Sequence, residues 1–207
     1  IKDSRIERDQ LFLASKVWTS SIYEGRHAVR QQVLQTLADL QTDYLDLYLV
    51  HWPVPGKHVE AYKELEALQA EGKIKSIGVS NYVVQDLEEL MSASSVVPSI
   101  NQIEVNPFLY RRQTLEWCAS RGIQIQAYRA LRDGKAFEDA TIVRVAAKHS
   151  KTPAQVLGRW CVQKGVIYIP KSVKKERMEE NMAVFDWALD SEDVAALDAL
   201  TTPQNLQ

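Results

Sequence analysis

The chain has 207 residues, of which 45% are hydrophobic and 25% charged, and this is the composition of a globular protein. Its formal net charge of -2 argues against binding to nucleic acid or to an anionic membrane surface, because both select a basic face. No apolar run approaches the roughly 20 residues that cross a bilayer. The two cysteines, Cys118 and Cys161, suit neither a disulfide framework nor a metal site, so we expect packed, reduced thiols, no metal and a cytoplasmic protein.

Short apolar runs rich in β-branched and aromatic residues alternate along the chain with segments of helical periodicity. Because the runs show little alternation between apolar and polar residues, they predict strands of a sheet covered on both faces. The expected strands lie at residues 11–15, 45–50, 74–79, 99–105, 122–128 and 166–169.

The segments between the expected strands predict amphipathic helices. The first helix places four apolar residues on one stripe, and the second ends at Gly72, a plausible C-cap. Further helices are expected within residues 86–94, 112–122 and 139–165, and Thr152 followed by Pro153 is typical of a helix start. The residues of the first stripe are Val29, Val33, Leu37 and Leu40.

Repeated strand–helix units indicate a parallel sheet with right-handed crossovers. Because no G-x-G-x-x-G follows a strand, a (β/α)₈ barrel is favoured over a doubly wound dinucleotide-binding sheet. Six units are two fewer than a barrel needs, and the sequence opens on "IKDSRIERDQ" without an initiator methionine. We therefore expect residues 1–207 to form a single barrel domain that is incomplete at its N-terminus.

Polar or aromatic side chains stand at or just beyond the carboxyl end of every expected strand, where a barrel carries its chemistry. Each position alone has an ordinary structural interpretation, such as a core aromatic, a turn or a helix cap. Taken together, they predict one pocket lined with hydrogen-bond donors and stacking surfaces. The residues are Lys16, Trp18, His51, Trp52, Ser80, Asn81, Gln102, Glu104, Tyr128, Lys171 and Ser172.

These strand ends resemble the successive motifs of the aldo-keto reductase family, in the same order, over about residues 6–200. The motifs are "SKVW", "YLDLYLVHWP", "GKIKSIGVSNY", "INQIEVNPF", "IQIQAY" and "IPKSVKKERMEEN". The resemblance implies a (β/α)₈ barrel that reduces a small aldehyde or ketone to an alcohol with NADPH by direct hydride transfer. It also implies a monomer whose partner is a small-molecule carbonyl substrate.

The resemblance implies that Lys16 and His51 are catalytic. A carbonyl that accepts hydride develops alkoxide character and needs a proton, and a phenol becomes a better donor when a cation lowers its pKa. In the family a lysine supplies that charge to an acid tyrosine, and a histidine orients the carbonyl. The family's acid tyrosine and aspartate precede the lysine, so we expect them upstream of residue 1.

For the cofactor, the resemblance assigns Ser80, Asn81 and Gln102 to the nicotinamide carboxamide, whose donor and acceptor edges suit amide and hydroxyl groups. Tyr128 matches the residue that stacks on the nicotinamide ring. Trp18 and Trp52 match the walls of an apolar substrate pocket.

The run "PKSVKKERMEEN" resembles the family's binding segment for the adenosine end of the cofactor. Lys171, Ser172 and Arg177 match the residues that hold the 2′-phosphate, which selects NADPH over NADH. Glu180 and Asn181 match those that bind adenine, and we count the intervening Val173 with the same segment.

One loop departs from the family. Arg129-Ala130-Leu131 stands where Ser-Pro-Leu usually follows the stacking tyrosine, in a loop that normally touches the pyrophosphate. We count Arg129 and Leu131 as cofactor-binding residues. The arginine either adds a phosphate contact or points to solvent, leaving the contact to the backbone.

Three alternatives remain open from the sequence. The chain could be a non-catalytic NADPH-binding relative or an inactive truncated form. It could also be an unrelated barrel that acts on phosphorylated sugars and holds the substrate phosphate with Lys171, Ser172 and Arg177.

Overall fold

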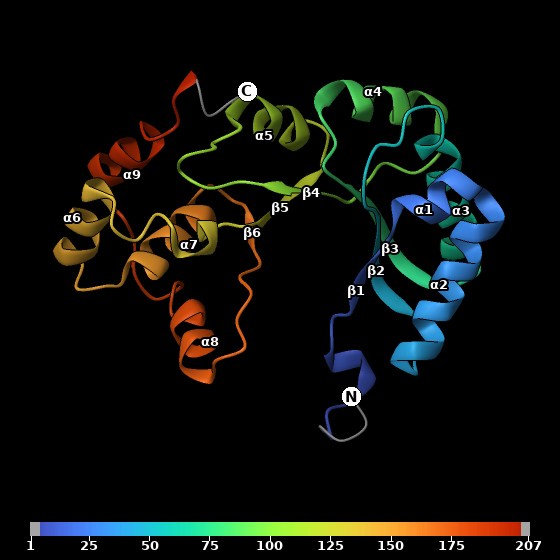
Figure 1. Cartoon of the computed structure of the whole chain (residues 1–207), viewed down its shortest axis with the longest axis horizontal. Coiled ribbons are helices and arrows are strands. Elements are labelled where there is room, and N and C mark those ends of the chain that lie inside the picture. The colour runs from blue at the N-terminus through green and yellow to red at the C-terminus, as the bar shows by residue number, and fades with distance from the viewer. Residues whose placement is uncertain (1–4, 204–207) are drawn as a thin grey trace. The chain divides into compact units, whose positions relative to one another are not determined.

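The structure is a computed structural model that describes residues 5–203 (Figure 1). The chain divides into two compact units, Ile1–Asn101 and Gln102–Gln207. The strands follow one another in sequence order, and the pairs β1–β2, β2–β3 and β5–β6 are parallel, as predicted. Their bounds are β1 (Ala14–Val17), β2 (Leu45–Val50), β3 (Ile74–Ser80), β4 (Ile100–Glu104), β5 (Gln124–Tyr128) and β6 (Ile167–Tyr168).

Helices occupy the connections between the strands, which gives the predicted alternation of β and α elements. The first unit contains η2 (Arg8–Gln10), α1 (Thr19–Glu24), α2 (Arg26–Leu40), α3 (His58–Ala70) and α4 (Val84–Ala93). The second unit contains α5 (Arg112–Ala119), η3 (Arg132–Gly134), α6 (Ala140–Lys148), α7 (Pro153–Gln163), α8 (Lys175–Met182) and α9 (Ser191–Asp198). Within residues 5–203, no helix combines the length and the apolar character that a membrane span requires.

The core of the first unit is built on β2, all six residues of which are buried. Leu47, Leu49 and Ile100 form one cluster in this core. Gly78 of β3 lets β4 approach closely, because a Cβ at this position would lie 2.6 Å from the carbonyl oxygen of Ile100. In α2 the predicted apolar stripe is buried as far as Leu37, whereas its last residue Leu40 is 38% exposed.

The predicted first strand, residues 11–15, is shifted from the observed one. β1 covers Ala14–Val17, because its pairing runs from Ala14 opposite Leu47 to Val17 opposite Val50. The preceding residues are fastened instead by Asp46, whose carboxylate accepts hydrogen bonds from the Leu13 N–H and from Arg8, both at 2.9 Å. The prediction that both faces of the strand are covered is also wrong for β1, because its first residue is exposed.

In the second unit, the expected helical stretch 139–165 forms two helices, α6 and α7, and Thr152 begins α7 with a capping box. Gly158 of α7 packs against β6, because a Cβ there would lie 2.9 Å from the ring of Tyr168. β6 is shorter than predicted, with two residues instead of four. Both cysteines are free and buried, as expected.

Candidate active site

Lys16 and His51 come together at the carboxyl ends of two adjacent strands. Lys16 stands in β1 opposite Leu49, and the His51 N–H donates to the Val17 carbonyl at 3.2 Å, which extends the pairing one residue beyond β2. Both side chains are partly exposed. The parallel register therefore brings Lys16, one residue before the end of β1, close to His51, one residue beyond the end of β2.

Burial and charge shift the pKa values of both groups downwards. Burial lowers the pKa of the Lys16 ammonium below its ordinary value. The pKa of His51 is lowered first by burial and then by the positive charge of Lys16. A neutral imidazole retains one N–H, so His51 can donate a hydrogen bond to a carbonyl oxygen without carrying charge.

We expect the pKa of His51, measured by NMR titration, to lie below its ordinary value of 6.5 and to rise in the Lys16→Met variant. Lys16→Arg, which keeps the charge, should leave it low. Because the pKa is lowered on folding, this histidine stabilises the fold fully above pH 6.5, and its contribution is lost as the pH falls through the lowered pKa. An unchanged His51 titration in Lys16→Met would contradict the electrostatic coupling.

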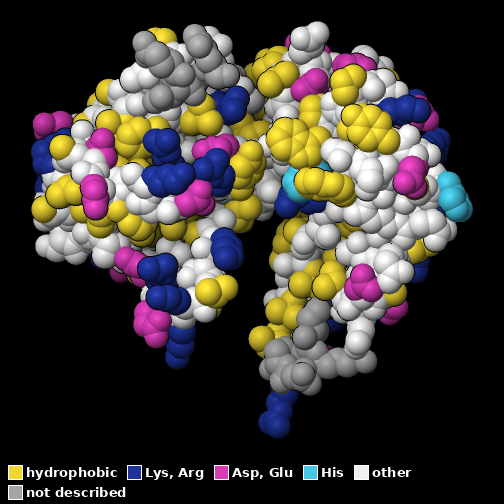
Figure 2. Space-filling view, in the orientation of Figure 1, with side chains coloured by type: hydrophobic (Ala, Val, Ile, Leu, Met, Phe, Trp, Pro, Cys, Tyr) yellow, Lys and Arg dark blue, Asp and Glu magenta, His cyan; other side chains and the backbone are white. Residues whose placement is uncertain are grey.

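Two tryptophans flank His51. The Trp18 ring meets the imidazole edge-on with centroids 4.7 Å apart, and the Trp52 ring lies stacked at 6.3 Å. They are 50% and 43% exposed, so they are surface groups and not core residues. Figure 2 shows other hydrophobic side chains at the surface of the face that it draws. An imidazole beside two exposed indoles suits an apolar carbonyl compound.

Ser80 and Asn81 form the turn at the end of β3. Ser80 is fully buried, and Asn81 adopts a left-handed backbone conformation with φ 63°. The Asn81 side-chain N–H₂ donates to the His51 carbonyl at 3.1 Å and to the Ser80 hydroxyl at 3.2 Å. The turn is thereby tied to the strand end that carries His51.

In the second unit, the predicted carboxamide ligand Gln102 lies buried in β4. Its side-chain N–H₂ donates to the side-chain oxygen of Gln126 in β5. Tyr128 ends β5 partly exposed, and burial raises the pKa of its phenol. The sequence analysis missed Gln126 because it lies inside an expected strand, and its hydrogen-bond partner becomes known only when the neighbouring strand is placed.

Arg129, the departure from the family motif, forms ion pairs with Glu104 at 3.2 Å and with Asp133 at 2.9 Å. Its φ is 49°. The guanidinium is exposed, but two carboxylates balance its charge, so it neither points freely to solvent nor offers an unpaired charge to a phosphate. The next residue but one, Leu131, accepts the Gly134 N–H at 2.9 Å and so helps to close the loop. A phosphate contact by Arg129 stays a prediction.

The predicted adenosine segment lies in and before α8. Ser172 accepts the Lys174 N–H at 3.1 Å, in the turn that leads into the helix. Asn181 is buried and accepts the Tyr168 hydroxyl at 3.4 Å. The remaining residues present their side chains partly or fully to the surface: Lys171, Val173, Arg177 and Glu180.

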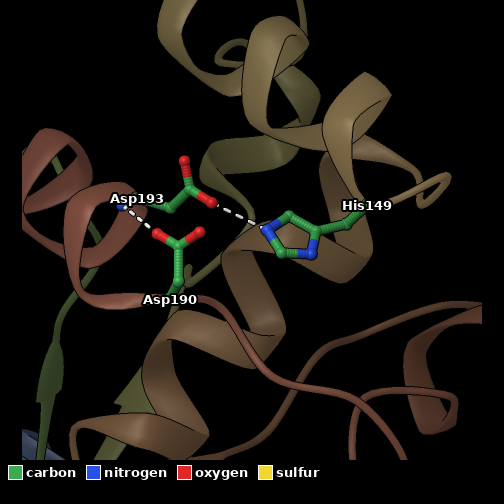
Figure 3. Close-up of side chains that lie close together, drawn as sticks. All are labelled: His149, Asp190 and Asp193. Atoms are coloured by element: carbon green, nitrogen blue, oxygen red, sulfur yellow. Dashed lines mark hydrogen bonds and ion pairs between the residues drawn. The ribbon is translucent and has the colours of Figure 1, made fainter.

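A second polar cluster, which the sequence analysis did not single out, joins α6 to α9. His149 Nε2 lies 2.7 Å from the carboxylate of the fully buried Asp193, next to Asp190 (Figure 3). The ligand atoms of these three residues lie within 4.8 Å of one another, as they would around a metal ion. The Lys148 ammonium, however, lies 2.5 Å from Asp190 and 2.9 Å from Asp193. The chain supplies its own cation here, so we interpret the cluster as an ion-pair network.

Asp193→Asn should lower the free energy of unfolding by about 1–3 kcal/mol, because Lys148 and His149 lose a buried, charged acceptor. Chemical denaturation measures the loss. Glu192→Gln, in the same first turn of α9, is the control and should change little. A variant as stable as the unsubstituted protein would contradict the structural role of the network.

The arrangement is typical of enzymes built from parallel β/α units, in which the carboxyl ends of the strands carry the chemistry. The chain belongs to the Aldo/keto reductase family, whose sequence profile matches residues 1–202. This confirms the predicted family and, because its members are (β/α)₈ barrels, the predicted fold class. The alternative of an unrelated barrel for phosphorylated sugars is wrong.

Characterised relatives of the chain are reductases. It is 40% identical over 206 residues to the glyoxal reductase of Bacillus subtilis, covering 100% of this chain and 74% of the relative. It is 39% identical over 210 residues to the methylglyoxal reductase DkgA of Escherichia coli K12, covering 100% of this chain and 75% of the relative.

Solved structures give the same result. A variant of Gox0644 in complex with NADPH superposes with a TM-score of 0.92 at 38% identity, over 96% of this chain and 73% of the other. The aldo/keto reductase of Brucella melitensis superposes with a TM-score of 0.91 at 38% identity, over 96% and 77%. Sequence and structure therefore agree that the chain is an oxidoreductase that reduces carbonyl compounds.

Proposed function

We propose that the protein reduces small aldehydes or ketones to alcohols by direct hydride transfer from NADPH. The observation that carries this proposal is the proximity of Lys16 and His51 near the ends of adjacent strands, where the charge of Lys16 lowers the pKa of His51 and where the rings of Trp18 and Trp52 contact the imidazole. The glyoxal and methylglyoxal reductases among its relatives support small 2-oxoaldehydes as the first substrates to examine.

In this proposal His51 donates its N–H to the substrate oxygen, and Lys16 provides the positive charge that favours the developing alkoxide. The same charge would lower the pKa of the acid tyrosine that the family resemblance implies, which would give its proton to the alkoxide as the hydride arrives. Trp18 and Trp52 exclude water from the substrate. The pocket would then combine an apolar wall with few polar groups, as small-molecule sites do.

The proposed cofactor site follows the family resemblance. The nicotinamide end would be held by amide, hydroxyl and aromatic groups, and the 2′-phosphate and adenine by the segment that leads into α8. The residues are Ser80, Asn81, Gln102, Tyr128, Arg129, Leu131, Lys171, Ser172, Val173, Arg177, Glu180 and Asn181. NADPH supplies the hydride when it is bound.

The test is carbonyl-dependent oxidation of NADPH with methylglyoxal, glyoxal and simple aldehydes, followed by the loss of nicotinamide absorbance. We expect NADPH to be consumed in equal amount to the alcohol formed, and NADH to be a much poorer donor. NADPH binding without turnover of any of these carbonyls would overturn the proposal and favour a non-catalytic NADPH-binding relative.

We propose further that residues 1–207 act as one domain, in a monomer of the cytoplasm. Light scattering should then give the mass of one copy of the polypeptide under study, which is 23.5 kDa for residues 1–207 alone, and denaturation should follow one cooperative transition. A mass of twice that value would contradict the monomer, and two separate transitions would contradict the single domain.

A further inference from the structure

We propose that Asn101 is a positioning residue for the nicotinamide end of the site, because it holds the turn that carries Ser80 and Asn81. This inference rests on the proposed function, since it needs Ser80 and Asn81 to contact the cofactor. Asn101 itself is fully buried in β4 and touches neither substrate nor cofactor in this proposal.

Two side-chain amides hold the turn from opposite sides. The Asn81 side-chain N–H₂ donates to the His51 carbonyl at the end of β2, at 3.1 Å. The Asn101 side-chain N–H₂ donates to the Tyr82 carbonyl, at 2.9 Å. The turn after β3 is thus fastened to its neighbouring strands β2 and β4, one on each side. Both bonds lie within the first unit.

The turn needs such support because of its backbone. Asn81 has a φ of 63°, in the left-handed region that non-glycine residues adopt rarely and keep only when their surroundings fix them. The next residue, Tyr82, is buried with its ring edge-on to His58, at a centroid distance of 5.4 Å. The Tyr82 hydroxyl has no hydrogen-bond partner among the described residues, so its ring packing and its carbonyl bond anchor the residue.

Loss of the Asn101 bond should therefore disturb the nicotinamide end and spare the adenosine end. Without its donor, the buried Tyr82 carbonyl loses a partner and the turn loses its fastening to β4. Ser80 and Asn81 then lose their fixed orientation, and through the Asn81 bond so does the His51 backbone. The proposed adenosine contacts lie in a separate stretch of the chain, residues 171–181.

The experiment compares NADP⁺ with 2′,5′-ADP, which carries the adenosine end but no nicotinamide, as ligands in calorimetric titrations of the full chain. In Asn101→Ala we expect NADP⁺ to bind about tenfold more weakly, the effect of one lost buried hydrogen bond, and 2′,5′-ADP to bind unchanged. Ser99→Ala is the matched control, because Ser99, just before β4, donates a side-chain bond to the Ile77 carbonyl within β3, at 2.8 Å, and not to the turn that follows β3. It should change neither affinity.

If Asn101→Ala does not fold, Asn101→Asp keeps the shape and makes the donor depend on pH. A protonated carboxyl can donate to the Tyr82 carbonyl and a carboxylate cannot, so the ratio of NADP⁺ to 2′,5′-ADP affinity should fall as the pH rises. The ratio is compared with that of the unsubstituted protein at each pH, which cancels the titration of both phosphates, including the 5′-phosphate that is a monoester only in 2′,5′-ADP.

The proposal is overturned if Asn101→Ala has the same ratio of NADP⁺ to 2′,5′-ADP affinity as the unsubstituted protein. It is also overturned if Asn101→Asp has that same ratio throughout the range from about pH 5 to about pH 9, in which a buried carboxyl ionises. Failure of the unsubstituted protein to bind either ligand would instead contradict the proposed function. The two failures are therefore distinguishable.

Discussion

Lys16→Met should reduce carbonyl turnover by about 10²–10⁴-fold, the range for loss of acid–base assistance, while NADPH affinity stays within a few-fold. Methionine keeps the length of the side chain and removes its charge. The Lys16 ammonium is held half-buried in β1 beside His51, where water screens its charge less than at an open surface. Its loss removes the cation that favours the developing alkoxide.

Steady-state kinetics with NADPH and methylglyoxal, alongside a cofactor titration, measures both parts of this prediction. Lys16→Arg restores the charge with a different shape and should retain more turnover than Lys16→Met. Turnover that survives in Lys16→Met at the level of the unsubstituted protein would refute the catalytic role. A large loss of NADPH affinity would show instead that Lys16 belongs to the cofactor site.

Arg177→Ala should weaken NADPH binding by about 1.5–3 kcal/mol, the range for a hydrogen bond to a charged group, and NADH binding much less. NADH lacks the 2′-phosphate that Arg177 would contact. The side chain is exposed on α8, so its removal should leave the fold intact.

Lys175→Ala provides a matched control for Arg177, because it removes a neighbouring exposed cation of α8 that already pairs with Glu179 at 3.6 Å. Fluorescence titrations of both variants with NADPH and NADH measure the effect. If Arg177→Ala weakened NADPH and NADH binding equally, Arg177 could not be assigned to the 2′-phosphate. If Lys175→Ala weakened NADPH binding as much as Arg177→Ala, the effect would be a general attraction between positive charge and the cofactor and not a specific contact.

The alternation of strands and helices could be predicted because it depends on local patterns. The apolar run of β2 is buried along its whole length, and Thr152 with Pro153 begins α7 where the sequence indicates. The end of β2 followed from the same reasoning, whereas β1 ends two residues later than predicted, so that Lys16 lies within the strand and His51 bonds to the Val17 carbonyl next to it.

Contacts between distant residues could not be predicted, because no local pattern encodes them. The start of β1 depends on the Asp46 carboxylate, which lies 33 positions along the chain from Leu13 and 38 from Arg8. The ion pair of Arg129 with Glu104 and the bond that Asn101 donates to the Tyr82 carbonyl likewise appear only when neighbouring strands are paired. Gln126 and Asn101, whose side chains bond to residues of neighbouring segments, were missed for this reason.

Transfer of deuterium tests the central claim most directly. The full chain is incubated with NADPH deuterated on the transferable position of the nicotinamide and with methylglyoxal, and the alcohol is examined by mass spectrometry. Direct hydride transfer predicts one deuterium on the former carbonyl carbon of the product. An alcohol that carries no deuterium, or no alcohol at all while NADPH is bound, would contradict the account.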